Sequence, residues 1–167
     1  LVRAQLDIAG GRTLEELGLV ASRVPMPRGI AMQVRVNAET MSADGSVRPS
    51  AGVLDAFDPP SGPGVRVDTS GHSGLRVNPR FDSLLAKVIV HVTTGDLHTV
   101  TAKARRALSE FRIAGVATNR EFLLNLLCSP DFAGGRWHTG FIEDNLASLC
   151  APGEHRRHYG EPGNASV

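Results

Sequence analysis

The sequence predicts an α+β domain with a mostly antiparallel sheet and flanking helices. Residues 30–39 alternate apolar and polar side chains, which is typical of a half-buried strand. Short strand patterns follow in the first half of the chain, and amphipathic helical patterns fill most of the second half. Strands that cluster early and helices that cluster late indicate the α+β class.

The composition is that of an ordinary globular protein. The 167 residues suffice for one domain with a core, and 41% of them are hydrophobic and 21% charged. A net charge of +1 gives no sign of binding to nucleic acid or to an anionic membrane. Without a signal peptide or an apolar run long enough to span a bilayer, the cytosol is the default location. Because the chain begins with Leu1 inside a helical pattern, we expect a piece of a larger protein.

The first thirty residues predict two short helices and a connection. Residues 1–9 form an amphipathic pattern that Gly10 and Gly11 should end. Residues 13–16 have the pattern of a capping box for a second short helix, which Gly18 should stop. The prolines of residues 22–28 then favour an extended connection.

The strand of residues 30–39 carries Arg35, the first candidate functional residue. Its polar face also holds Gln33, Asn37 and Glu39, whereas the alternate apolar side chains should face a core. A strand is a rigid support, so the guanidinium of Arg35 would point in a fixed direction, as recognition of a specific oxygen or carboxylate requires. The alternative is an ordinary solvated arginine on the wet face of a sheet.

The middle of the chain predicts further strands separated by turns. Residues 42–45 form a turn, and residues 47–56 are a strand region that a proline and a glycine interrupt. Residues 58–64 are a stiff loop rich in proline and glycine. This loop is either a plain connector or a surface that meets a partner. Residues 65–68 form a short alternating strand.

Residues 81–91 are the most apolar run. Residues 84–90 resemble a central strand, although a helix is an alternative for the first half of this segment. Asp82 lies at its beginning and Lys87 lies inside it. A lysine within an apolar run needs a partner or a route to solvent.

The second half predicts helices and then a tail. Residues 96–113 form an amphipathic helix, residues 118–121 a capping box that opens another helix, and residues 140–149 a final helix. Residues 151–167 have the composition of a flexible tail or linker, so we place the domain at residues 1–150. With only two cysteines, no disulfide framework is expected, and Cys128 should be a small core residue.

Reasoning from the residues alone ends at an α+β domain with an unusual arginine. The sequence has no glycine-rich phosphate loop that opens a helix, no Ser/His/Asp order and no metal-ligand cluster.

A series of motifs nevertheless resembles, in the same order, the C-terminal domain of biotin carboxylase. This is the last part of the ATP-grasp component of acetyl-CoA, propionyl-CoA, methylcrotonyl-CoA and pyruvate carboxylases, and the resemblance covers roughly residues 1–149. The motifs are Arg35-Val-Asn-Ala-Glu39, Arg48-Pro-Ser-Ala-Gly52, Ser61-Gly-Pro-Gly-Val-Arg-Val-Asp68, Phe81-Asp-Ser-Leu-Leu-Ala-Lys87 and Ala107-Leu-Ser-Glu-Phe-Arg-Ile-Ala-Gly-Val-Ala-Thr-Asn119.

The resemblance implies a role for several residues. Enzymes of this family use ATP and Mg²⁺ to activate bicarbonate as carboxyphosphate, and the ureido nitrogen of biotin is then carboxylated. Arg35 matches the arginine that contacts biotin and stabilises its enolate-like form, as a fixed guanidinium can. Asp82 is a candidate biotin-site residue that would hold this guanidinium. Pro63 and Arg66 fall at or near the subunit interface of a homodimer.

The resemblance also implies partners. ATP and Mg²⁺ would be bound by ATP-grasp domains upstream of Leu1, so the isolated chain should be inactive. Biotin would be carried on a separate biotin carboxyl carrier domain, because the chain has no Met-Lys-Met motif. A carboxyltransferase would choose the acyl-CoA or keto acid. The chain departs from the family at His72, Leu75 and Arg80, where aromatic residues are common, so aromatic contacts on that edge are not implied.

Two other functions are compatible with the sequence. The chain could be a non-catalytic module for dimerisation and scaffolding. It could also be the C-terminal domain of another ATP-grasp ligase, although the Arg35-Val-Asn-Ala-Glu39 motif argues against that choice.

Overall fold

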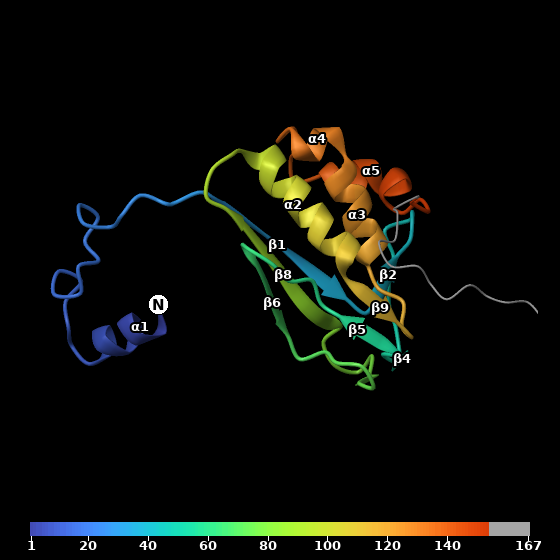
Figure 1. Ribbon diagram of the computed structural model, residues 1–167, viewed down its shortest axis with the longest axis horizontal. Helices are drawn as coiled ribbons and strands as arrows, with labels where there is room; N and C mark the ends of the chain where they lie inside the picture. Colours follow the sequence, from blue (N-terminus) through green and yellow to red (C-terminus); the bar gives the residue numbers. More distant parts are fainter. Residues whose placement is uncertain (154–167) are drawn as a thin grey trace, which may run out of the picture.

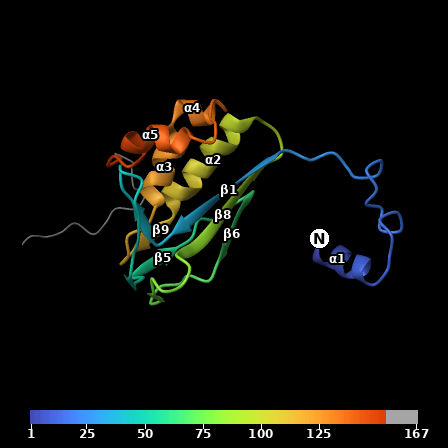
Figure 2. The ribbon, with the colours of Figure 1, turned by 180° about the vertical axis from the view of Figure 1, so that it is seen from behind.

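A three-stranded antiparallel sheet forms the centre of the structure, a computed structural model that describes residues 1–153. Its strands are β1 (Ile30–Asn37), β8 (Leu84–Val92) and β6 (Val65–Thr69), in the order β1-β8-β6. Residues 84–92 are therefore a central strand, and the helical alternative for this segment is wrong. Figures 1 and 2 show the helices of the second half gathered on one side of this sheet.

Three two-stranded antiparallel pairs extend the fold. They are β2 (Glu39–Met41) with β3 (Val47–Pro49), β4 (Gly52–Val53) with β7 (Arg76–Val77), and β5 (Ala56–Asp58) with β9 (Arg112–Ala114). The strand region predicted at residues 47–56 is thus divided among three short strands. Together with the central sheet, these pairs confirm the α+β class and its antiparallel pairing.

The core lies between the sheet and the helices that cover it. The helices are α2 (Leu97–Glu110), α3 (Arg120–Cys128), α4 (Pro130–Ala133) and α5 (Phe141–Leu149). Val36, Val88, Val100 and Leu108 are completely buried, and they come from β1, β8 and α2. Burial of such side chains supplies most of the driving force for folding, so β1 and β8 are anchored through their helix-facing side.

The helix predicted at residues 96–113 ends earlier than expected. Asp96 caps its beginning, but Phe111 adopts an extended conformation and residues 112–114 pair with β5 as β9. Phe111 is buried at helical spacing from Ala107 and Leu108, so it continues the apolar pattern of the helix although the backbone has changed. Periodicity alone cannot detect such a change. The short helix α4 was not predicted either.

Two local predictions in the second half are wrong. The N-cap of α3 is Asn119 and not Thr118, and the Thr118 hydroxyl accepts from the amide of Arg120 over 3.4 Å, so the capping box predicted between Thr118 and Glu121 does not form. Cys128 is exposed and is not a core residue. The final helix, α5, agrees with the prediction for residues 140–149.

The N-terminal segment lies apart from the sheet in both views (Figures 1 and 2). The helix α1 (Val2–Ala9) ends at Gly10 as predicted, and none of its residues is buried. The amide of Thr13 donates to the Glu16 carboxylate over 2.9 Å, and the amide of Glu16 donates to the Thr13 hydroxyl over 3.2 Å. These are the bonds of the predicted capping box, but the residues that follow form turns and the predicted second helix is absent from this segment.

Most of the tail predicted at residues 151–167 lies outside the described residues, which end at residue 153. Within residues 1–153, no helix has the length and apolar character needed to cross a membrane.

Candidate functional site

Arg35 lies on the open face of the central sheet. In β1, Val34 and Val36 are buried in the core, and Arg35 between them is exposed. Because successive side chains of a strand point to opposite faces, Arg35 points away from the helices that cover the other face. The alternation predicted from the sequence is therefore confirmed, and the guanidinium is mounted on a strand whose opposite face is fixed by packing.

Strand register places Lys87 between Arg35 and Asp68. Arg35 of β1 pairs with Lys87 of β8, and Lys87 pairs in turn with Asp68 of β6. Directly opposed residues have Cβ atoms about 4.5–5.5 Å apart, and like charges in such positions destabilise a sheet. Two cations thus stand side by side on the open face. Lys87, which the sequence placed in an apolar run, reaches solvent on this face and is half-buried.

The carboxylate in this row is already held by Arg66. Nε of Arg66 donates to Oδ1 of Asp68 over 2.9 Å, and Nη2 donates to Oδ2 over 2.7 Å. This two-pronged pair, helped by the nearby charge of Lys87, holds the pKa of Asp68 below its ordinary value, and it raises the pKa of Arg66. The Arg35–Lys87 pair therefore keeps a positive potential that Asp68 only partly offsets.

A second set of polar contacts fixes the end of β1. The carboxylate of Glu39 accepts hydrogen bonds from Nδ2 of Asn37 over 2.9 Å and from the hydroxyl of Ser83 over 2.7 Å. The carbonyl of Ser83 accepts from the amide of Ala38 over 2.7 Å. Glu39, the acidic residue nearest to Arg35 along the chain, is thus engaged with the start of β8.

Asp82 lies at the turn that leads into β8, next to Ser83. Its carboxylate accepts a hydrogen bond from the amide of Leu84 over 2.8 Å, so it shapes the entry into that strand. The ion pairs within residues 1–153 include none between Asp82 and Arg35. The role of Asp82 in a biotin site stays a prediction.

The two predicted interface residues lie at the β6 edge of the sheet but face different ways. Pro63 lines a small hollow of about 80 Å³ between its loop and α2, together with Lys103. The loop is tied to β8, because the carbonyl of Gly64 accepts from the amide of His91 over 2.8 Å. Arg66 instead lies on the open face with Arg35. An edge strand offers unpaired backbone groups to a partner, but an interface here stays a prediction.

Asn119 contacts the β1 backbone from the carbonyl of Arg35 to that of Asn37. Its Oδ1 accepts from the amide of Asn37 over 2.9 Å, and its Nδ2 donates to the carbonyl of Arg35 over 3.1 Å. Its own amide donates to the carbonyl of Asn37 over 3.1 Å. The sequence suggested only a helix start at this position, and no local signal predicts contacts across 82 residues of chain.

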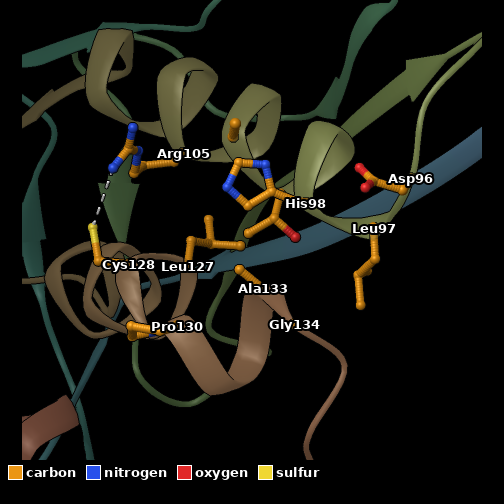
Figure 3. A pocket seen from close by; sticks show the side chains of 11 residues that line it. Asp96, Leu97, His98, Arg105, Leu127, Cys128, Pro130, Ala133 and Gly134 are labelled. Carbon is orange, nitrogen blue, oxygen red and sulfur yellow. Dashed lines mark hydrogen bonds between the residues drawn. The ribbon is translucent and has the colours of Figure 1, made fainter.

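A cavity of about 550 Å³ lies on the helical side of the molecule, between α2 and the α3–α4 corner (Figure 3). His98, Arg105 and Cys128 line it, and Nη1 of Arg105 lies 4.0 Å from the sulfur of Cys128. Since α2 covers the face of the sheet opposite Arg35, this cavity is separate from the candidate site. Within residues 1–153, no three metal-binding side chains come together.

Fold and site together define a sheet domain that presents a pair of cations on its open face. The family model for the biotin carboxylase C-terminal domain matches residues 33–144, which include both cations of the pair. The chain belongs to the biotin carboxylase C-terminal domain family.

Known proteins of this family include enzymes with different acceptors. Human mitochondrial pyruvate carboxylase is 40% identical over 146 residues, which cover 87% of this chain and 12% of that protein. The alpha3 subunit of a biotin-dependent acyl-coenzyme A carboxylase from Mycobacterium leprae (strain TN) is 39% identical over 156 residues, 91% of this chain and 25% of that protein. The solved structure of a single-chain, multi-domain long-chain acyl-CoA carboxylase matches with a TM-score of 0.81 and 51% identity, covering 90% of this chain and 16% of that one.

The chain therefore spans an eighth to a quarter of the length of these curated relatives, 12% and 25% respectively. All three relatives are carboxylases, so the chain corresponds to one part of an enzyme.

Proposed function

We propose that the chain presents Arg35 to biotin within a biotin-dependent carboxylase, during the ATP- and bicarbonate-dependent carboxylation of biotin. The family supports this reading, because its relatives are pyruvate and acyl-CoA carboxylases. The observation that carries it is the placement of Arg35 directly opposite Lys87 on the open face of the sheet. A like-charged pair costs stability in a sheet, and a ligand with negative charge would offset that cost.

The residues present fit a ureido group. When bound, biotin supplies the ureido nitrogen that receives the carboxyl group. The planar guanidinium of Arg35 can donate to the ureido oxygen, and its direction is set in advance by β1. Lys87 adds positive potential from the neighbouring strand, and Arg66 keeps the Asp68 carboxylate engaged. Donors fixed in advance stabilise negative charge as it develops, without the cost of reorienting them.

Other parts of a longer protein would supply the remaining functions. We infer that ATP and Mg²⁺ bind to ATP-grasp domains outside this chain, that a biotin carboxyl carrier domain delivers biotin, and that a carboxyltransferase selects the acceptor. The small share of each relative that the chain covers supports this division. We further propose a homodimer with Pro63 and Arg66 near its interface, and a second biotin-site role for Asp82. Cytosolic location stays a prediction, since the human relative is mitochondrial.

The test is substitution of Arg35 in the full-length carboxylase that contains this chain. Arg35→Ala should lower the rate of carboxylation of free biotin by about 10²–10³-fold, the loss typical of removing one charge-stabilising donor. Arg35→Lys should restore little, because an ammonium group cannot reproduce the planar fork. The melting temperature should change little, because an exposed side chain leaves no cavity when shortened.

Arg76→Ala is the matched control, since Arg76 is also an exposed arginine on a strand but lies in the β4–β7 pair. It should leave both turnover and melting temperature unchanged. Normal turnover in Arg35→Ala would reduce the residue to a solvated arginine, and a large fall in melting temperature would make its role structural.

A further inference from the structure

The outer edge of β1 is occupied by a side chain and not by another strand. β1 ends the central sheet in the order β1-β8-β6, so its backbone groups on the side away from β8 have no strand partner within that sheet. At residues 35–37 the amide group of the Asn119 side chain takes that place, accepting from the Asn37 amide and donating to the Arg35 carbonyl. One residue of an added strand would make two such contacts with its own N–H and C=O groups, which point to the same side of a strand.

This pairing encloses the residue that carries the guanidinium. On one side, Arg35 is paired in register with Lys87 of β8. On the other side, the Asn119 side chain donates to the carbonyl of Arg35 and accepts from the amide of Asn37. The direction of a strand side chain follows from the backbone that carries it, so contacts on both sides limit the directions that the Arg35 side chain can take.

Asn119 makes these contacts in place of the one its position favours. Asparagine before a helix usually accepts a hydrogen bond from the first turn. The side chains of Asp96 and Ser129 do so at the starts of α2 and α4, but Asn119 makes no such bond at α3. Its side chain is committed to β1.

The start of α3, which follows Asn119, is held against α2. Arg120, the next residue, donates from Nε to the carbonyl of Leu108 over 2.8 Å and from Nη2 to the carbonyl of Ser109 over 3.1 Å. These contacts tie the start of α3 to the last turns of α2, which packs on the sheet. Hydrogen bonds of Asn119 and Arg120 therefore connect β1 to the end of α2.

We propose that Asn119 is a positioning residue that holds Arg35 in the direction required for biotin. This rests on the role proposed for Arg35 above. Asn119 does not contact the substrate; it acts through the β1 backbone. Its loss leaves the guanidinium present but less well directed, and a small misplacement of a reacting group can cost up to about 100-fold in rate.

The experiment uses the full-length carboxylase with free biotin as the probe. Asn119→Ala should lower kcat/KM for biotin by about 10- to 100-fold, within the range expected for misplacement, and should leave the KM values for ATP and bicarbonate unchanged. Asn119→Asp keeps an acceptor for the Asn37 amide but has no N–H for the Arg35 carbonyl. It should fold even if the alanine variant does not, and should show the same selective loss for biotin.

Asn125→Ala is the matched control. Asn125 lies in α3, the helix that Asn119 precedes, and its Nδ2 donates to the carbonyls of Leu149 and Ala151, each over 2.8 Å. Its removal should lower the melting temperature by an amount similar to that for Asn119→Ala, but biotin kinetics should stay normal. A loss of biotin kinetics that simply follows the melting temperature in both variants would overturn the proposal.

A double substitution separates this proposal from the function assigned to Arg35. If Asn119 acts only through Arg35, the Arg35→Ala/Asn119→Ala enzyme should be no slower than Arg35→Ala alone. Losses that multiply in the double variant, or normal biotin kinetics in both Asn119 variants, would overturn the positioning role and leave the role of Arg35 intact. Normal kinetics in Arg35→Ala would overturn both.

Discussion

Asp96 fixes the first turn of α2, the helix that supplies much of the core. Its Oδ1 accepts from the amide of Thr99 over 2.9 Å and from the Thr99 hydroxyl over 2.8 Å. The same hydroxyl accepts from the amide of Asp96 over 3.5 Å. These bonds favour the charged carboxylate, the contact with the Thr99 amide most strongly, and so they hold the pKa of Asp96 below its ordinary value. A capping carboxylate also interacts favourably with the helix dipole.

This pKa shift predicts a pH dependence of stability. A carboxylate whose pKa is lower in the folded state stabilises the fold above its unfolded pKa, near 3.8, and this contribution is lost as the pH falls through the lower folded value. In the isolated chain, the melting temperature of Asp96→Asn should therefore fall less between pH 5 and pH 2.5 than that of the parent. Circular dichroism melts across this range measure it.

The matched control for this series is Asp55→Asn, which changes an exposed aspartate outside any helix. It should keep the steep fall of the parent chain. Identical pH profiles for Asp96→Asn and the parent would show that the capping carboxylate makes no titratable contribution to stability.

The sequence predicts only some of the individual residues of the candidate site. Alternation alone placed Arg35 on the polar face of its strand, because a period of two fixes which residues share a face. Lys87 and Asn119 were missed for different reasons. The position of Lys87 opposite Arg35 depends on the pairing register of strands fifty residues apart, and Asn119 carries a helix-start signal although its side chain serves a strand.

Whole elements were predicted better than their boundaries. The strands β1, β6 and β8 and the helices α3 and α5 lie where the patterns put them, because the apolar residues of each recur at the spacing of one structure type. The strand region predicted at residues 47–56 forms parts of three short strands. The last residues of the helix predicted at 96–113 belong to β9. In both places the backbone changes direction while the apolar spacing continues, so tertiary pairing decides the outcome.

Gly115 shows how close packing fixes the connection between β9 and α3. Its φ of +94° is unfavourable for other residues, and a Cβ there would collide with the carbonyl of Val53 and lie 2.7 Å from the amide of Asp55. Gly115→Ala should therefore destabilise the chain by roughly 2–5 kcal/mol, the sum of left-handed strain and overpacking. Denaturant unfolding of the isolated chain measures this loss.

Gly74→Ala is the control for the strain alone. Gly74 has a similar φ of +88°, but a Cβ there would meet no atom within 4 Å. Its substitution should cost about 1–2 kcal/mol. Equal losses at the two positions would mean that the approach of the β9–α3 connection to residues 53–55 does not constrain the fold.

At the scale of the whole molecule, one face of the sheet builds the core and the other builds the candidate site. The helices bury Val36, Val88 and their neighbours, and the open face keeps the charged row of Arg35, Lys87 and Asp68. Large apolar side chains such as Leu6 in α1, which is 69% exposed, lie apart from this body. The core and the candidate site thus lie on opposite faces of the same three-stranded sheet.

This division predicts that the isolated chain folds but performs no chemistry alone. It should melt cooperatively, because the sheet and helices enclose a continuous buried cluster. It should show no bicarbonate-dependent ATP hydrolysis, since the chain spans only 12–25% of the length of these curated relatives. The assay compares the purified chain with the full-length carboxylase at equal concentration. Hydrolysis above the blank that depends on bicarbonate would place a nucleotide site within this chain, and the division of labour argued above would fail.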